Sequence, residues 1–307
     1  DGSLWLWGQN LSLSQHVNTS RSGANGQWNG GPQNYTAPIR VEGVQDAIAV
    51  AGGYGGYRRF VLLHSNGRLS RFGDHDKGIP IMQLRSLEGV NDIIALSSGA
   101  KHFAALKKDG TVWTWGSNDS GQLGSGSTTI QDQPRRVVGI GDVVSLAAGN
   151  DATLAVKKDG TVWGWGKSIH AITSKGLNVT SSLSPKQIPE LKDIVAVAMP
   201  GNGYSNGTHY LAVDRNGRVW SWGLNSHGQL GQGTKIHDIV KKPAMIKELD
   251  GVTSLASGLA HSLALRSDGT IQSWGMNSSG QLGNASGFDS AFPVSVVSGK
   301  VAAEKNR

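Results

Sequence analysis

Hydrophobic residues in this chain form short runs separated by polar, glycine-rich segments. One kind of run is rich in small residues and occurs, for example, as AIAVAGG from Ala47, IIALSSG from Ile93 and VVSLAAG from Val143. A second kind follows it, such as HFAAL from His102 and HSLAL from His261. Short apolar runs bounded by Gly, Asn and Asp are typical of β-strands, and helical periodicity is nowhere sustained. The pattern therefore predicts an all-β protein.

An Asp-Gly or Asn-Gly pair follows the second run. We expect it to form a tight hairpin turn, because these residues tolerate positive φ. The next strand carries Trp at alternate positions, as in TVWTWG after Gly110. A short run such as PIRV from Pro38 or FPVSV from Phe292 closes the unit. The turn recurs along the chain and begins at Asp1, Asn66, Asp109, Asp159, Asn216 and Asp268.

Each repeat therefore contains four expected strands, which we name A to D in chain order. Four-stranded units repeated around an axis make a β-propeller, and strand A, with the smallest side chains, is expected to lie nearest the axis. We interpret residues 1–307 as a single propeller domain whose two ends fall inside a repeat. Six C strands are recognisable, so the ring has six blades or seven. The two Trp of a C strand share one face and are expected to pack between neighbouring blades.

Composition limits the function classes. The net charge is +7, but only 17% of residues are charged and no Lys/Arg run occurs. Proteins that bind nucleic acid more often cluster their Lys and Arg residues, so we favour a protein or glycan partner. The positive net charge suggests that this partner is acidic. The chain has no Cys, which excludes disulfides and thiolate metal sites. No apolar run is long enough to span a membrane. The chain starts at Asp1 rather than Met, and we interpret it as processed or trimmed.

The combined motif GxxHSLALxxDGTVWTWGxNxxGQLGxG resembles the repeat of the regulator of chromosome condensation family. Its GQLG element stands at Gly121, Gly228 and Gly280, with a variant GQW from Gly26 to Trp28. The resemblance covers nearly the whole chain and implies a β-propeller, usually of seven blades; we expect a bacterial-type member. It also implies a role in protein interaction, since relatives include a bacterial inhibitor of β-lactamases, whereas the founding member promotes nucleotide exchange on a small GTPase.

Departures from the repeat indicate where a site would lie. Four loops are longer or unlike the others, and they run from Gln9 to Ala37, Gly52 to Phe60, Lys167 to Ser184 and Pro200 to Tyr210. All four are A–B or C–D loops. Because strands alternate in direction within a blade, these loops emerge on one face, and binding concentrates on loops of a rigid scaffold. We call this the loop face, and we call the opposite side, with its uniform Asp-Gly turns, the turn face.

Tyr, Arg, Asn and Gly are combined in the loops expected around the axis, a composition suited to recognition. A second candidate position lies seven residues before each Asp/Asn-Gly pair, where His occurs in three of five blades. We interpret this recurring His as structural, hydrogen-bonding a neighbouring loop. The candidate binding residues are Trp28, Tyr54, Tyr57, Arg58, Arg59, His102, Asp151, Tyr204, His209 and His261.

Three functions remain open at this stage. The favoured one is a non-catalytic binding scaffold, monomeric and secreted or displayed on a cell surface. The second is nucleotide exchange on a small GTPase, which only the resemblance implies. The third is an enzyme that acts on an acidic polysaccharide, in which a basic rim with Tyr, His and Arg neutralises a uronate and abstracts a proton. The residues considered for this role are Tyr57, Arg58, Arg59, His102, His209 and His261. The sequence contains no phosphate loop and no nucleophile motif, and we expect no cofactor, no metal ion and no catalytic residues.

Overall fold

The computed structural model describes residues 2–8, 35–52, 60–72, 84–167, 181–201, 208–234 and 239–297. All regular elements in these ranges are β-strands, twenty-two in number. They form five four-stranded sheets and one two-stranded sheet, β1–β2, and every pairing is antiparallel between strands that follow one another in the chain. No helix long and apolar enough to cross a membrane occurs in this part of the chain. The expected repeat of four strands is confirmed.

The strands can be grouped by their place in the blade. The A strands are β3 (Ala47–Gly52), β7 (Ile93–Ser98), β11 (Val143–Ala148), β15 (Ile194–Ala198) and β19 (Val252–Ser257). The B strands are β4 (Phe60–His64), β8 (His102–Lys107), β12 (Ala152–Lys157), β16 (His209–Asp214) and β20 (His261–Arg266). The C strands are β1 (Trp5–Gly8), β5 (Leu69–Phe72), β9 (Val112–Gly116), β13 (Val162–Gly166), β17 (Val219–Leu224) and β21 (Ile271–Gly275). The D strands are β2 (Tyr35–Arg40), β6 (Arg85–Ser86), β10 (Gln131–Arg136), β14 (Ser182–Ile188), β18 (Ile239–Met245) and β22 (Ser290–Ser295).

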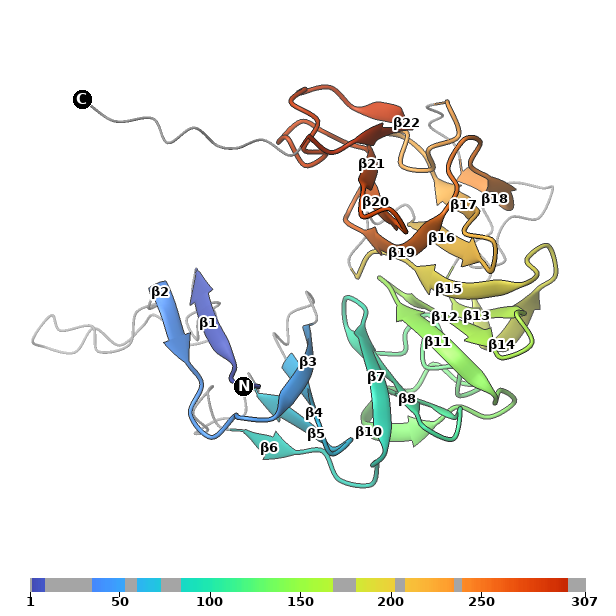
Figure 1. Ribbon diagram of the computed structural model, residues 1–307. Coiled ribbons are helices and arrows are strands. Elements are labelled where there is room, and N and C mark those ends of the chain that lie inside the picture. Colours follow the sequence, from blue (N-terminus) through green and yellow to red (C-terminus); the bar gives the residue numbers. More distant parts are fainter. Residues whose placement is uncertain are drawn as a thin grey trace, which may run out of the picture.

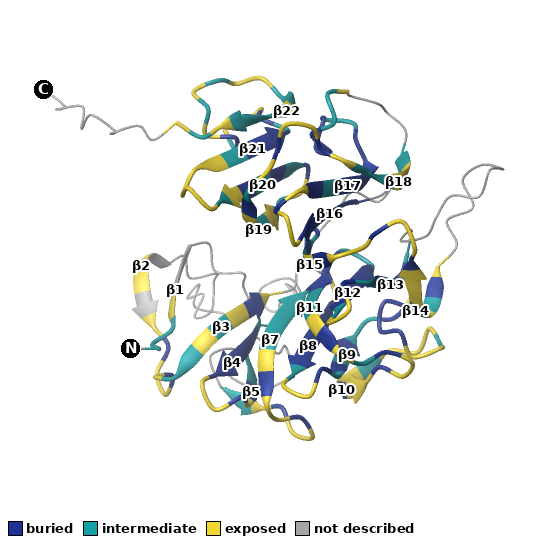
Figure 2. Cartoon of the chain, turned by 45° about the vertical axis from the view of Figure 1, so that its right-hand side comes forward, coloured by how far each residue is buried: buried dark blue, intermediate teal, exposed yellow. Residues whose placement is uncertain are grey.

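The sheets follow one another around an arc, with β1–β2 at one end and the sheet β19–β22 at the other (Figure 1). The A strands of neighbouring blades lie against each other along the inside of the arc. Except for β20, the B strands are the most deeply buried of the described strands, whereas the D strands are largely exposed (Figure 2). This is the geometry of a β-propeller, with the small side chains of strand A where space is tightest.

The hairpin turns connect the blades as well as the strands. Gly110 adopts φ 78, a left-handed conformation that glycine reaches without strain. Asp109 Oδ1 accepts hydrogen bonds from the Thr111 amide at 3.0 Å and from its hydroxyl at 2.6 Å. The Gly110 carbonyl accepts a further bond, 3.0 Å long, from the Val143 amide of the next blade. The same turn-to-blade bond recurs at the next two B–C turns, from Ile194 and from Val252.

The Trp pairs pack between blades, as expected. Trp165 has no exposed surface and joins a cluster with Leu106 and Val112 of the preceding blade, against which Trp163 packs as a half-buried neighbour. The pair Trp220 and Trp222 occupies the equivalent place one blade later. Aromatic side chains of this size supply much of the apolar area that a blade contact buries, so the Trp strands explain cohesion rather than binding.

Candidate functional site

Six of the candidate binding residues lie outside the described residues: Trp28, Tyr54, Tyr57, Arg58, Arg59 and Tyr204. The flanking strands show where their loops start and end. The segments connect β1 to β2, β3 to β4 and β15 to β16, and the fourth variable segment connects β13 to β14. All are A–B or C–D connections, so the antiparallel order of the strands brings them out on one face. The candidate site at the loop face therefore stays a prediction.

His102 and His209, by contrast, lie inside the molecule. Both side chains are fully buried at the seams between blades. His102 Nε2 lies 2.9 Å from Thr153 Oγ1 of the next blade, and His209 Nε2 lies 3.0 Å from Ser262 Oγ. A partner that touches only the surface does not reach either ring, which agrees with a structural role for the recurring His.

The hydroxyl in each pair makes a further hydrogen bond to a loop. Thr153 Oγ1 donates to the Gln122 carbonyl at 2.9 Å, and Ser262 Oγ donates to the Gln229 carbonyl at 2.9 Å. Both carbonyls belong to GQLG loops of the blade that carries the His. Each seam therefore contains a chain of hydrogen bonds from His to hydroxyl to loop carbonyl.

Burial controls the protonation of these rings. Desolvation lowers the pKa of His102 to about 3, and it lowers the pKa of His209 to about 3 with a further contribution from nearby His261. Both rings are therefore neutral at physiological pH, and a buried neutral imidazole of such low basicity is a poor proton acceptor for catalysis. Gly99 makes room for the first ring, since a Cβ at this position would overlap the His102 imidazole.

The seams without this His are filled differently. The residue that corresponds to Thr153 is Phe103 in one blade and Tyr210 in another, and each stacks on a Trp of its own blade. The ring centroids lie 5.5 Å apart for Phe103–Trp115 and 5.2 Å apart for Tyr210–Trp222. The position seven residues before the turn holds Ala152 in the blade that precedes Tyr210. Seams with a His–hydroxyl pair and seams with an aromatic ring at this position thus alternate along the described part of the arc.

Asp151 and His261 occupy intermediate positions at the ends of their strands. Asp151 is half-buried next to β12, and its carboxylate accepts from Asn150 Nδ2 at 3.1 Å. Burial raises the pKa of Tyr210, and the charge of Asp151 raises it further. His261 starts β20 as His102 starts β8, but its ring is half-buried, because no described sheet packs on the far side of the last blade of the arc. Desolvation lowers the pKa of His261 in the same direction.

A buried Asn that the sequence analysis did not single out shapes each GQLG loop. Asn118 is fully buried, and its Nδ2 donates to the carbonyls of Ser127 and Thr129 at 2.8 and 3.0 Å. Its Oδ1 accepts from the Leu123 amide at 3.0 Å. Asn225 and Asn277 make the matching bonds in the two other GQLG loops. The spacing N-x-x-G-Q-L-G was the available signal, because it places one amide side chain where it can close the loop.

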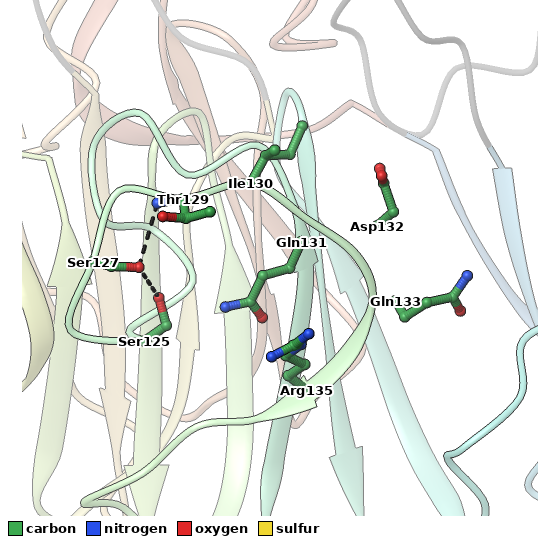
Figure 3. Close-up of a pocket in the computed structure, with 8 residues that line it drawn as sticks. All are labelled: Ser125, Ser127, Thr129, Ile130, Gln131, Asp132, Gln133 and Arg135. Atoms are coloured by element: carbon green, nitrogen blue, oxygen red, sulfur yellow. Dashed lines mark hydrogen bonds between the residues drawn. The ribbon is translucent and has the colours of Figure 1, made fainter.

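The loop that Asn118 closes borders a hollow of about 500 Å³ beside β10. Ladder contacts join Gln131 to Gly116 and Arg135 to Thr114, so β10 gains two residues relative to β9 and bulges away from it. Figure 3 shows Gln131 and Arg135 turned toward the loop of Ser125 and Ser127, while Asp132 and Gln133 lie on the other side. All but one of the residues that line it are polar or charged in type: Ser125, Ser127, Thr129, Ile130, Gln131, Asp132, Gln133 and Arg135. Among the described residues, no group of three His, Asp or Glu side chains could hold a metal ion.

The sheets follow one another along an arc, every C strand except β5 carries Trp, and hydrogen bonds cross the seams. These features define a repeat β-propeller with an elaborated loop face. The chain belongs to the family of RCC1-like domains, whose family description matches residues 1–305. It is 31% identical over 242 residues to the human "Probable E3 ubiquitin-protein ligase HERC6", covering 74% of this chain and 18% of that protein. It is 28% identical over 230 residues to the Arabidopsis thaliana "Ultraviolet-B receptor UVR8", covering 75% of this chain and 51% of the receptor.

Among solved structures, Prp20p from Saccharomyces cerevisiae matches with a TM-score of 0.73 and 20% identity, over 96% of this chain and 73% of that one. Human WBSCR16 matches with a TM-score of 0.67 and 20% identity, over 90% of this chain and 88% of that one. Both support the propeller fold. The chain spans about half the length, or much less, of the curated relatives it matches.

Proposed function

We propose that this propeller is a non-catalytic scaffold that binds a protein partner through its loop face. The observation that supports the proposal most directly is the arrangement of the variable segments: all four join A to B or C to D, while the turn face repeats the same Asp-Gly hairpin. In many proteins a rigid scaffold carries variable loops, and the loops form the recognition surface.

One protein with this fold binds several protein partners. The structural study of Prp20p describes its binding to Gsp1p and histones, and a second one shows it bound to Kap60. These are partners of Prp20p, and the partner of this chain has to be identified by experiment. The recurring His does not support the enzyme alternative, because His102 and His209 are buried and neutral.

The test is capture of partners by the full chain from the lysate and the secretome of its source, followed by affinity measurement with each purified partner. The variant Tyr57→Ala/Arg58→Ala/Tyr204→Ala removes three predicted contacts on the loop face. The control Asn66→Ala/Lys108→Ala/Arg215→Ala removes three exposed side chains from the turn face. We expect the first variant to weaken binding at least tenfold, about 1.4 kcal/mol, with the control unchanged. The reverse result would place the site on the turn face and refute the proposal.

A further inference from the structure

Cations gather on the outside of the propeller in a way that the linear sequence conceals. We define the outer wall as the first five of the six D strands, β2, β6, β10, β14 and β18, which follow one another around the arc (Figure 1). These five strands carry seven cationic side chains and a single carboxylate, Asp132. The cations are Arg40, Arg85, Arg135, Arg136, Lys186, Lys241 and Lys242.

The inner side of the arc differs from this wall in charge. The A strands that line the inside of the arc contain no charged residue. On the wall, Arg135, Lys186 and Lys241 are exposed, and none of the three side chains has a hydrogen bond or ion pair with another described residue. Exposed cations on successive outer strands favour the approach of an extended polyanion.

The hollow beside β10 interrupts this wall and adds short-range recognition. Its volume of about 500 Å³ lies within the ordinary range of small-ligand sites. Ser125, Ser127 and Gln131 present hydroxyl and amide groups toward it, beside the Arg135 guanidinium (Figure 3). Gln131 Oε1 is shielded from solvent and has no hydrogen-bond partner. A buried acceptor in this state is stabilised by a ligand that brings a donor.

That acceptor distinguishes between polyanions. A sugar ring carries hydroxyl donors next to its carboxylate or sulfate, so it can satisfy Gln131 and Arg135 together. A nucleic-acid backbone presents phosphate oxygens, which only accept, and the base donors of a duplex lie in its grooves. We propose that the outer wall binds a linear anionic polysaccharide, uronate-type or sulfated, with one acidic sugar unit in the hollow beside β10. This surface is separate from the loop face that we propose for protein binding.

The test measures binding of the full chain to fluorescent oligosaccharides by anisotropy at 50 and 200 mM salt. The probes are an oligogalacturonate, a heparin oligosaccharide, a neutral maltooligosaccharide and a DNA duplex of matched charge. We expect binding to at least one anionic glycan, none to the neutral one, and a marked loss of affinity at the higher salt concentration. Failure of both anionic glycans to bind at 50 mM salt would overturn the proposal, as would a duplex that binds as tightly as the better glycan.

Two variants locate the site. Arg135→Glu/Arg136→Glu/Lys186→Glu should weaken glycan binding at least tenfold. Lys108→Glu/Lys158→Glu/Arg215→Glu changes the net charge equally on the turn face, where all three side chains are exposed, and should leave most of the affinity. Equal losses would mean a nonspecific charge effect and would overturn the assignment.

A third variant, Gln131→Leu, tests the hollow without changing the charge. We expect it to weaken glycan binding several-fold and to leave the salt dependence unchanged. Unchanged affinity would remove the hollow from the proposed site. Thermal unfolding of each variant shows whether the fold is retained, and affinities are compared only for variants that keep it.

Discussion

His102 and Thr153 stand 51 residues apart in the chain and share a 2.9 Å hydrogen bond in the core. Thr153 satisfies two groups at once, because it also donates to the Gln122 carbonyl. At the scale of single residues, the seam therefore depends on a hydroxyl with no exposed surface. Removing a buried partner costs more than the bond itself contributes, since the groups left behind remain desolvated.

Thr153→Val tests this arrangement because it keeps the shape of the side chain and removes the hydroxyl. We expect the free energy of unfolding to fall by about 1–3 kcal/mol, measured by urea denaturation. Thr128→Val, at an exposed loop position, is the control and should change stability by less than about 0.5 kcal/mol. Equal effects of the two substitutions would contradict the role of the seam hydroxyl.

Acid should destabilise the propeller through the same rings. His102 and His209 keep a pKa of about 3 in the folded protein, whereas an unfolded His has a pKa near 6.5. The unfolded state therefore binds more protons than the folded state between these values. The contribution of these two rings to stability is fully present above pH 6.5 and is lost as the pH falls toward 3. Each ring contributes a slope of about 1.4 kcal/mol per pH unit.

Urea denaturation between pH 7 and pH 4 measures this slope. The variant His102→Gln/His209→Gln should be less stable than the native chain at pH 7 but lose less stability on acidification. The same slope in both proteins would show that other groups cause the acid sensitivity.

The sequence indicates a structural His at this position but not its partner. The recurring position before each turn is visible in the chain, and so is the alternation of small and Trp-bearing strands. The contact from His102 to Thr153 depends on how two blades are stacked, and no local pattern encodes that offset. The same reason explains the outer wall: seven cations in five separate segments do not form a run, and only the arc brings them together. The hollow beside β10 lies at a bulge, and no residue type in the sequence indicates the register shift that forms this bulge.

At the scale of elements, the GQLG loop behaves as one unit built around a buried Asn. Asn118 connects the start, the middle and the end of the loop through its bonds to Leu123, Ser127 and Thr129. The hollow beside β10 therefore depends on a side chain that does not line it.

Asn118→Ala should lower the free energy of unfolding by about 2–4 kcal/mol, because several backbone groups lose their partner inside the protein. It should also weaken any ligand of the hollow, since Ser127 and Thr129 are no longer held. Asn91→Ala, an exposed residue, serves as the control. Retention of native stability in Asn118→Ala, by thermal and urea unfolding, would contradict the proposed closure of the loop.

At the scale of the whole molecule, equivalent positions differ according to what covers them. Leu106 is 1% exposed between two blades, while its counterpart Leu265, in the last blade of the arc, is 41% exposed. Val112 and Ile271 show the same contrast, at 0% and 41%. Equivalent positions in different blades therefore do not contribute equally to stability.

The pair of variants Leu106→Ala and Leu265→Ala measures this difference. The first opens a cavity between packed sheets and should cost about 2–4 kcal/mol. The second removes a side chain that is already in contact with water and should cost less than about 1 kcal/mol. Similar losses in urea denaturation would mean that the face of β20 is covered in solution.

The alternation of seams has a consequence for how such a chain can change over generations. A GQLG loop, a His in the same blade and a hydroxyl in the following blade occur together at two seams, whereas a blade without that loop precedes Phe103 or Tyr210. Duplicating or exchanging one blade would bring a His against an aromatic ring, or leave a hydroxyl facing nothing. The repeats look interchangeable in sequence, yet each fits only one kind of neighbour, and we expect evolution to conserve the order of the blades.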